Sequence, residues 1–311
     1  MRVVFLGTPE FAVPSLRGLA AHQQVVAVYT QPDRPKGRGN QISESPVKLA
    51  AKELGVKVVQ PERIRHAENL AKLKAWDAEL MVVVGYGQII PQSIIDLPRF
   101  GILNVHASLL PKYRGAAPIQ WAIANGEKES GVTIMQIDAG LDTGDMLLKK
   151  RVAIGDEETA PELSARLASL GAELLLEAID QIAAGTVIRE AQRNEDATLA
   201  PILKREDGLV DWRRRAEEIY HRWRGFNPWP GAYTFFRGQQ MSLSEMQVAK
   251  RASGGKCGHL WSENRRLYVT CGNKSTLELL GVQIAGKKHT KAIPFLNGYQ
   301  LVESEVLGEK P

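Results

Sequence analysis

An uninterrupted apolar run, Leu80 to Val84, is the feature that most limits how this chain can fold. Side chains alternate between the two faces of a strand, so a run without polar residues must be covered on both faces. Similar short, β-branched runs occur at Val3 to Leu6, Val25 to Thr30, Val56 to Val59 and Ile102 to Val105. Strands of this kind are typical of a parallel sheet between layers of helices. We therefore expect an α/β domain with a mostly parallel sheet.

The segments between these runs carry helix boundary signals. Ser45 followed by Pro46 provides an N-cap and a first-turn proline for a helix that should end near Leu54. The spacing from Thr159 to Glu162 matches a capping box, and the apolar residues beyond it recur at helical intervals as far as Gly185. The first part of the chain thus alternates strands with helices.

The pattern changes after residue 186. Residues 187–206 are polar and irregular, as expected of a linker, and a short helix is expected over residues 216–224. Beyond it, apolar residues alternate with polar ones around Met241 and around Leu267, the pattern of half-buried antiparallel strands. We expect a catalytic domain over residues 1–186, the linker, and a smaller β-barrel domain over residues 207–311.

Charge is unevenly distributed between these parts. Residues 1–186 contain 20 Lys and Arg against 21 Asp and Glu, whereas residues 187–311 contain 20 against 14. A basic second part indicates a polyanionic partner, although a solvated basic surface is also common.

Two classes of protein are disfavoured by simple counts. The two cysteines, Cys257 and Cys271, have neither zinc-site nor disulfide spacing, and we expect two small buried thiols. The apolar start of the chain is too short for a signal peptide, and no stretch reaches the roughly 20 apolar residues that cross a bilayer. We therefore expect a cytoplasmic protein that has no membrane partner.

The first strand-to-helix turn does not predict a dinucleotide site. Only Gly7 of the fingerprint glycines is present, and Pro9 occupies the place of the second. No phosphate-binding loop of the GxxxxGK[ST] type occurs in the sequence, so the sequence predicts neither a nicotinamide site nor a P-loop nucleotide site.

Polar residues gather where one predicted strand ends. Asn104 and His106 are two residues apart, so they should point to one face at the carboxyl end of a parallel strand, where open α/β sheets place their sites. An amide donor and an imidazole can stabilise an oxyanion and move a proton. By itself, however, the Asn-x-His pair is also compatible with a structural role.

A second polar segment runs from Asp138 to Asp145 and contains Asp142. These acids can be turn residues that cap their own backbone. They form no recognisable metal-ligand set with the single nearby histidine. Alternatively, one carboxylate orients His106 and increases its basicity.

Together the two segments resemble the core of the folate-dependent formyltransferases. Two such motifs in this order, about 35 residues apart, are a specific signature. The family's catalytic Asn, His and Asp correspond to Asn104, His106 and Asp142, and its folate-contacting turn corresponds to Ser108, Leu109, Leu110 and Pro111. The resemblance implies 10-formyltetrahydrofolate as the formyl donor, a Rossmann-like catalytic domain, a smaller OB-like domain that binds tRNA, and no metal.

A basic loop bears on the acceptor substrate. Residues 31–39 resemble the loop by which the family members that formylate methionyl-tRNA engage the acceptor end of tRNA, and its cations are Arg34, Lys36 and Arg38. Cations among Gly and Pro suit phosphate contacts, although without the resemblance they would read as an ordinary solvated loop. The resemblance implies aminoacylated initiator tRNA as the acceptor and no obligate protein partner.

The second part carries one further point of resemblance. Residues 226–233, from Phe226 to Tyr233, resemble the carboxy-terminal domain of the same enzymes. Their aromatic rings suit base stacking. Their Pro-Trp-Pro-Gly stretch has strong turn character, which favours core and turn positions instead.

The resemblance implies attack of a methionyl α-amino group on the formyl carbon, with Asn104 and His106 stabilising the oxyanion. His106 and Asp142 would carry the proton to the folate nitrogen. The alternatives are a formyltransferase or hydrolase of the same family with a small acceptor, or a non-catalytic RNA-binding protein.

Overall fold

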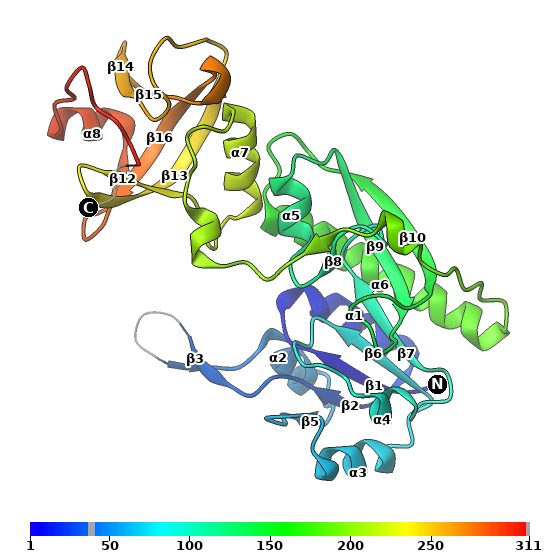
Figure 1. Cartoon of the computed structure of the whole chain (residues 1–311). Coiled ribbons are helices and arrows are strands. Elements are labelled where there is room, and N and C mark those ends of the chain that lie inside the picture. Colours follow the sequence, from blue (N-terminus) through cyan, green and yellow to red (C-terminus); the bar gives the residue numbers. More distant parts are fainter. Residues whose placement is uncertain (37–40, 309–311) are drawn as a thin grey trace. The chain divides into compact units, whose positions relative to one another are not determined.

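The computed structural model describes residues 1–36 and 41–308 and divides the chain into two compact units (Figure 1). The first unit comprises Met1–Ile119, Glu129–Ala153 and Glu162–Pro201. The second comprises Gln120–Lys128, Ile154–Pro161 and the chain from Ile202 onward. Two short internal stretches therefore group with the second unit.

The first unit is built on a seven-stranded sheet of order β10-β9-β7-β6-β1-β2-β5. The pairs from β7 to β5 are parallel, and β9 and β10 add antiparallel strands at the other edge. The mostly parallel sheet expected from the sequence is confirmed. The strands are β1 (Arg2–Gly7), β2 (Gln24–Tyr29), β5 (Val58–Val59), β6 (Leu80–Val84), β7 (Ile102–His106), β9 (Glu129–Gln136) and β10 (Met146–Ala153).

The apolar strands are covered on both faces, as their composition requires. All five residues of β6 are buried. Met81 and Val83 join one hydrophobic cluster with Leu73 of α3 (Ala67–Ala75) and Ile94 of α4 (Gln92–Ile95). The alternate residues of β6 point to the opposite face. This two-sided burial explains why the central strand carries no polar residue.

Helices surround the sheet of the first unit. The Ser45 side chain accepts a hydrogen bond from Lys48 N at 3.1 Å, which confirms the predicted N-cap of α2. Gly171 of α6 lies so close to the sheet that a Cβ there would come within 2.7 Å of Val105 Cγ1. The helices are α1 (Val13–His22), α2 (Pro46–Glu53), α3 (Ala67–Ala75), α4 (Gln92–Ile95) and α6 (Ala160–Ala184), with α5 (Pro118–Ala124) shared between the units.

The second unit is a smaller antiparallel sheet of order β12-β13-β16-β15-β14, with β17 pairing with β16. This β-rich second domain is the smaller OB-like domain that the sequence led us to expect. Its core includes Trp212 and Phe236, and Trp212 Nε1 donates to Thr234 Oγ1 at 3.0 Å. The elements are α7 (Ala216–Gly225), β12 (Tyr233–Phe236), β13 (Gln239–Ala249), β14 (Leu260–Glu263), β15 (Arg266–Thr270), β16 (Thr276–Ile284), β17 (Thr290–Lys291) and α8 (Ala292–Gly298).

The cysteines differ in environment. Cys271 is buried, and burial raises the pKa of its thiol to about 12. Cys257 is exposed, so the prediction of two buried thiols is wrong for this residue. Residues 253–258 around it are irregular and end in a turn rather than forming a strand, so this segment is not part of a sheet. Among the described helices, none is long and apolar enough to cross a membrane.

Candidate active site

The first two predicted site residues lie on one face of β7, where this strand ends. Asn104 and His106 alternate with Val105 and share the face of Ile102, which belongs to the cluster between the sheet and α3 and α4. Antiparallel β9 flanks β7 and sets Thr133 opposite His106. His106 is buried, whereas Asn104 is partly exposed, so solvent or a ligand can reach this part of the site at the Asn104 side chain.

Asp142 lies beside both of these residues, although 38 positions separate it from Asn104 in the chain. Asn104 Nδ2 donates to Asp142 Oδ1 at 3.3 Å, and the backbone N–H of Gly115 donates to Asp142 Oδ2 at 2.8 Å. An amide has two N–H donors, so Asn104 keeps the capacity to donate elsewhere. The sequence predicted these three residues as a set, and the structure brings them together.

The imidazole of His106 lies between two acceptors. His106 Nε2 contacts the backbone carbonyl of Tyr113 at 2.9 Å, so Nε2 acts as the donor there. His106 Nδ1 lies 3.6 Å from Asp142 Oδ2, which is longer than a hydrogen bond. Catalytic contacts of this kind often tighten only when substrate is bound. The arrangement is suited to holding an imidazole while its proton moves.

The loop that carries Asp142 is folded tightly on itself. Asp138 Oδ1 accepts from Gly140 N at 3.0 Å and from Thr143 Oγ1 at 2.7 Å. Asp142 adopts φ +53°, the left-handed region that aspartate tolerates better than most residues. A Cβ at Gly144 would come within 1.9 Å of Gln136 O, so only glycine fits there. One acid of this segment therefore is a turn residue, and another faces His106.

The predicted folate-contacting turn follows β7 directly. Ser108 and Leu110 are buried, whereas Leu109 and Pro111 are partly exposed. Ser108 Oγ donates to Lys112 O at 2.6 Å and closes the turn. The turn therefore leaves apolar side-chain surface accessible while its polar groups are bound internally.

Two residues that the sequence did not single out hold this turn. Thr133 Oγ1 donates to Ser108 O at 2.7 Å and accepts from Leu110 N at 3.1 Å. Lys149 Nζ donates to Leu110 O at 3.1 Å. Thr133 is the one polar residue within the buried stretch Val132 to Met135, a signal that sequence reading had available.

The basic loop is partly described. Arg34 and Lys36 belong to β3 (Arg34–Lys36), which pairs with β4 (Gln41–Ser43), and Arg34 is exposed. Arg38 lies outside the described residues. At the base of this hairpin, Lys48 and Gln60 donate to the carboxylate of Asp33, and these hydrogen bonds, Lys48 first, lower the pKa of Asp33.

The aromatic segment of the second unit divides between core and surface. Phe226 is buried and packs edge-on against Trp121, whereas Trp229 is 56% exposed. Arg222 lies over the Phe226 ring, 4.8 Å from its centroid. The core-and-turn interpretation therefore holds for Phe226, whereas Trp229 is exposed to solvent.

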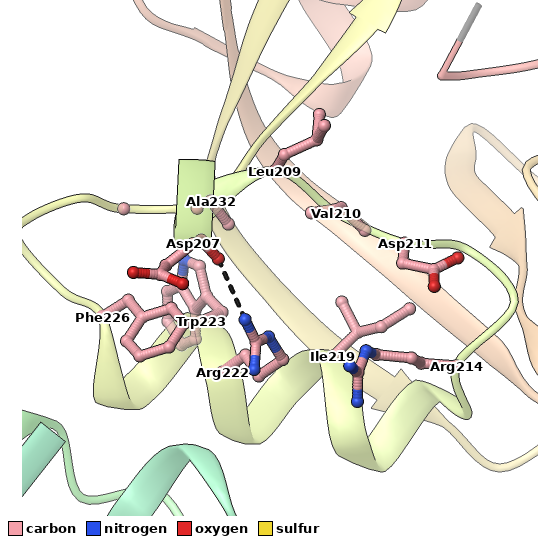
Figure 2. Close-up of a pocket in the computed structure, with 12 residues that line it drawn as sticks. Asp207, Leu209, Val210, Asp211, Arg214, Ile219, Arg222, Trp223, Phe226 and Ala232 are labelled. Atoms are coloured by element: carbon pink, nitrogen blue, oxygen red, sulfur yellow. Dashed lines mark hydrogen bonds between the residues drawn. The ribbon is translucent and has the colours of Figure 1, made fainter. Parts of the chain in front are cut away.

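Two cavities of the molecule do not contain the predicted site residues. Figure 2 shows a cavity in the second unit where Arg222 Nη2 donates to Asp207 O at 3.2 Å beside Trp223; its volume is about 10 Å³, room for little more than a water molecule. A larger surface hollow of about 620 Å³, lined in part by Lys57 and Trp76, contains none of the predicted site residues. Within the described ranges, no group of three or more His, Cys, Asp or Glu side chains is placed to hold a metal ion.

Comparison with known families gives a match over both units. The profile described as "Formyl transferase" matches residues 1–179, and "Formyl transferase, C-terminal domain" matches residues 202–300. Methionyl-tRNA formyltransferase of Solibacter usitatus (strain Ellin6076) is 54% identical over 310 residues, 99% of each chain. That of Koribacter versatilis (strain Ellin345) is 52% identical over 310 residues, again 99% of each chain.

Solved structures share the fold at lower identity. WlaRD, a sugar 3N-formyl transferase crystallised with dTDP and 5-N-formyl-THF, is 19% identical with a TM-score of 0.66, covering 93% of this chain and 99% of that one. HypX from Aquifex aeolicus, crystallised with tetrahydrofolic acid, is 16% identical with a TM-score of 0.61, covering 95% of this chain and 47% of that one. At these identities the two structures show that the fold is shared.

Proposed function

The chain belongs to the formyl transferase family, and from this premise we propose that it transfers a formyl group from 10-formyltetrahydrofolate to the α-amino group of methionyl-tRNA. The product is N-formylmethionyl-tRNA, the species that initiates translation. The observation that carries this proposal is the 54% identity, over 99% of both chains, to a protein named methionyl-tRNA formyltransferase. A match restricted to the first unit would have supported the chemistry alone.

The reaction needs an attacking amine and a stabilised oxyanion. The free amine of the methionyl group attacks the formyl carbon, a C–N bond forms, and negative charge develops on the formyl oxygen. The second N–H of Asn104 is available to donate to this oxygen, because only one contact, to Asp142 Oδ1, is made by its amide nitrogen among the described residues. Removal of one such donor typically lowers the rate on the order of 10²–10³-fold.

The intermediate then collapses, and the bond between the formyl carbon and folate N10 breaks. The amine must lose a proton and N10 must gain one. We assign this transfer to His106, with the carboxylate of Asp142 facing its Nδ1 at 3.6 Å. Both side chains are held from other directions, by Tyr113 O and by Gly115 N, so they enter the reaction already oriented.

The folate cosubstrate would lie against the turn of Ser108 to Pro111. The residues present fit such a ligand, because Leu109 and Pro111 keep accessible apolar surface for a flat ring while Thr133 and Lys149 hold the backbone. Its role is to supply the formyl group. No metal is needed for a transfer that depends on positioning and electrostatics.

The tRNA would be contacted by Arg34, Lys36 and Arg38 and by the second domain. The excess of Lys and Arg beyond residue 186 supports a polyanionic partner for that part. We propose residues 1–186 as the catalytic domain, 187–206 as the linker and 207–311 as the tRNA-binding domain. The proposed place of action is the cytoplasm, where charged initiator tRNA is used, and no obligate protein partner is required.

The decisive experiment incubates the purified chain with 10-formyltetrahydrofolate and methionyl-tRNA and measures both formyl-methionine and free tetrahydrofolate. We expect equal amounts of the two products. Parallel reactions with an amino-sugar nucleotide and with no acceptor test the alternatives. Tetrahydrofolate released equally without an acceptor would identify a hydrolase, and transfer only to the sugar would identify a small-acceptor enzyme.

A further inference from the structure

A glutamine in the polar segment after α6 contacts the backbone of the loop that carries Asp142. Gln192 Nε2 donates to Asp142 O at 2.8 Å and to Gly144 O at 2.8 Å. Gln192 Oε1 accepts from Arg114 Nε at 3.0 Å. The partners fix the orientation of this amide, because only its nitrogen can donate to carbonyls and only its oxygen can accept from a guanidinium.

This glutamine completes the restraint of Asp142. The carboxylate is held by Asn104 Nδ2 and by Gly115 N, whereas the carbonyl of the same residue is held by Gln192. Asp142 adopts φ +53°, a conformation that few residues populate unless their surroundings enforce it. Contacts at both ends of the residue are what keep its side chain turned toward His106.

The side-chain oxygen of Gln192 contacts a residue of a short strand pair. Arg114 is 7% exposed and belongs to β8 (Arg114–Gly115), which pairs with β11 (Leu199–Ala200). Gly115, the next residue, is the one whose N–H binds the Asp142 carboxylate. The segment after α6 therefore ties together the two motifs of the site, 114–115 and 142–144, from within the first unit.

We propose that Gln192 is a positioning residue for the proton transfer at His106. It acts through the backbone of residues 142–144, not by touching substrate, and the proposal rests on the formyl transfer proposed above. Without its two N–H donors the Asp142 loop loses its backbone restraint, and the carboxylate moves relative to Nδ1 of His106. A misplacement of about 1 Å at a reacting group can lower a rate on the order of 10²-fold.

A purely structural role makes a different prediction. If Gln192 served only to pair the buried guanidinium of Arg114, then Gln192→Glu would preserve the function, because a carboxylate accepts from arginine better than an amide does. In the positioning role, Gln192→Glu fails, since a carboxylate cannot donate to the carbonyls of Asp142 and Gly144. The two roles thus predict opposite outcomes for one variant.

The experiment compares Gln192→Glu and Gln192→Met with the wild-type chain. Gln192→Met keeps the side-chain length and removes all three hydrogen bonds. Asn69→Ala is the control, because Asn69 is a buried amide on α3, away from the site, that donates to Arg63 O at 3.0 Å. Release of tetrahydrofolate is followed at steady state with the concentration of each substrate varied in turn, which gives kcat and both KM values, and unfolding by urea is measured for each variant.

We expect kcat to fall 10-fold to 100-fold in both Gln192 variants, with KM for both substrates within about 2-fold of wild type. Asn69→Ala should lose stability but keep kcat. In an Asp142→Asn background, Gln192→Met should cause little further loss, because residues that act as a unit are non-additive. Wild-type kcat in Gln192→Glu, additive losses in the double variant, or an equal kcat loss in Asn69→Ala would each overturn the proposal.

Failure of the proposed function has a separate signature. If the wild-type chain releases tetrahydrofolate with a different acceptor, or with none, the acceptor assignment is wrong. The same variants then report on Gln192 through that reaction, because the proton transfer to folate remains. If the wild-type chain releases no tetrahydrofolate under any condition, both proposals fail.

Discussion

Replacement of Thr133 by valine tests how the turn of residues 108–111, which we propose contacts folate, is held in place. Valine has nearly the shape of threonine, so the buried site, which is 0% exposed in the structure, is not opened or overfilled. The change removes the hydroxyl that donates to Ser108 O at 2.7 Å and accepts from Leu110 N at 3.1 Å. Two backbone groups in a buried region then lose this partner.

The magnitude follows from what remains unpaired. A buried donor or acceptor left without a partner costs about 1–3 kcal/mol, and a carbonyl, with two lone pairs, is affected less than an N–H. We therefore expect Thr133→Val to lower the free energy of unfolding by about 2–4 kcal/mol. A typical domain is stable by roughly 5–15 kcal/mol, so the variant should still fold. Because the change loosens the turn that we propose contacts folate, KM for the folate should rise while KM for tRNA stays unchanged.

Thr133→Ser is the control, since it keeps the hydroxyl and loses only a methyl group, at about 1 kcal/mol. Urea unfolding gives the stabilities, and initial rates at varied folate concentration give KM. A serine variant as unstable as the valine variant would refute the reasoning, because the hydroxyl would then contribute nothing beyond packing. If Thr133→Val and Thr133→Ser had the same KM for folate, the hydrogen bonds that hold this turn would not contribute to folate binding.

Three further predictions concern charge. Asp142→Asn should leave urea unfolding close to wild type and lower kcat on the order of 10²-fold or more, and near-normal turnover in single-turnover assays would exclude its role in proton transfer. Arg34→Ala should weaken tRNA binding, reduce the slope of log affinity against log salt by about 1 and leave folate KM unchanged; an effect on folate alone would contradict the assignment. The pKa of Asp33 is lowered by hydrogen bonds from Lys48 and then Gln60, so its contribution to stability is present above its ordinary value of 3.8 and is lost as pH falls through the lower folded value. The difference in unfolding free energy between wild type and Asp33→Asn should therefore shrink below pH 3.8, and a constant difference would show that the carboxylate charge is not involved.

Much of the first unit follows from local patterns in the sequence. The uniform apolar character of Leu80–Val84 predicted a strand buried on both faces, and the cap at Ser45 placed the start of α2. Both signals depend on residues close together in the chain, where backbone geometry alone relates spacing to direction. The pairing of Asn104 with His106 on one face rests on the same period of two.

The hydrogen-bond partners of the residues that support the site could not be predicted from such local patterns. Thr133 binds residues 25 and 23 positions away, and Gln192 binds residues 50 and 48 positions away. A polar residue in a strand or in an irregular segment gives no sign of its distant partner. The exposure of Cys257 was misjudged for a related reason, because burial habits of a residue type do not say which turns a sheet will cover.

By itself, the sequence determined the main strands of the first sheet, the two-sided burial of Leu80–Val84 and the motifs that carry Asn104, His106 and Asp142, since these depend on period, composition and short spacing. The tertiary structure alone decided that Asp142 faces His106, that Thr133 binds the backbone of Ser108 and Leu110, and that Gln192 binds the backbone of the Asp142 loop. The physical reason is that hydrogen bonds between distant segments form only after the sheet has brought strand ends together. The direction of each side chain along one strand follows from the local backbone. The residues that contact the end of that strand are decided by the fold.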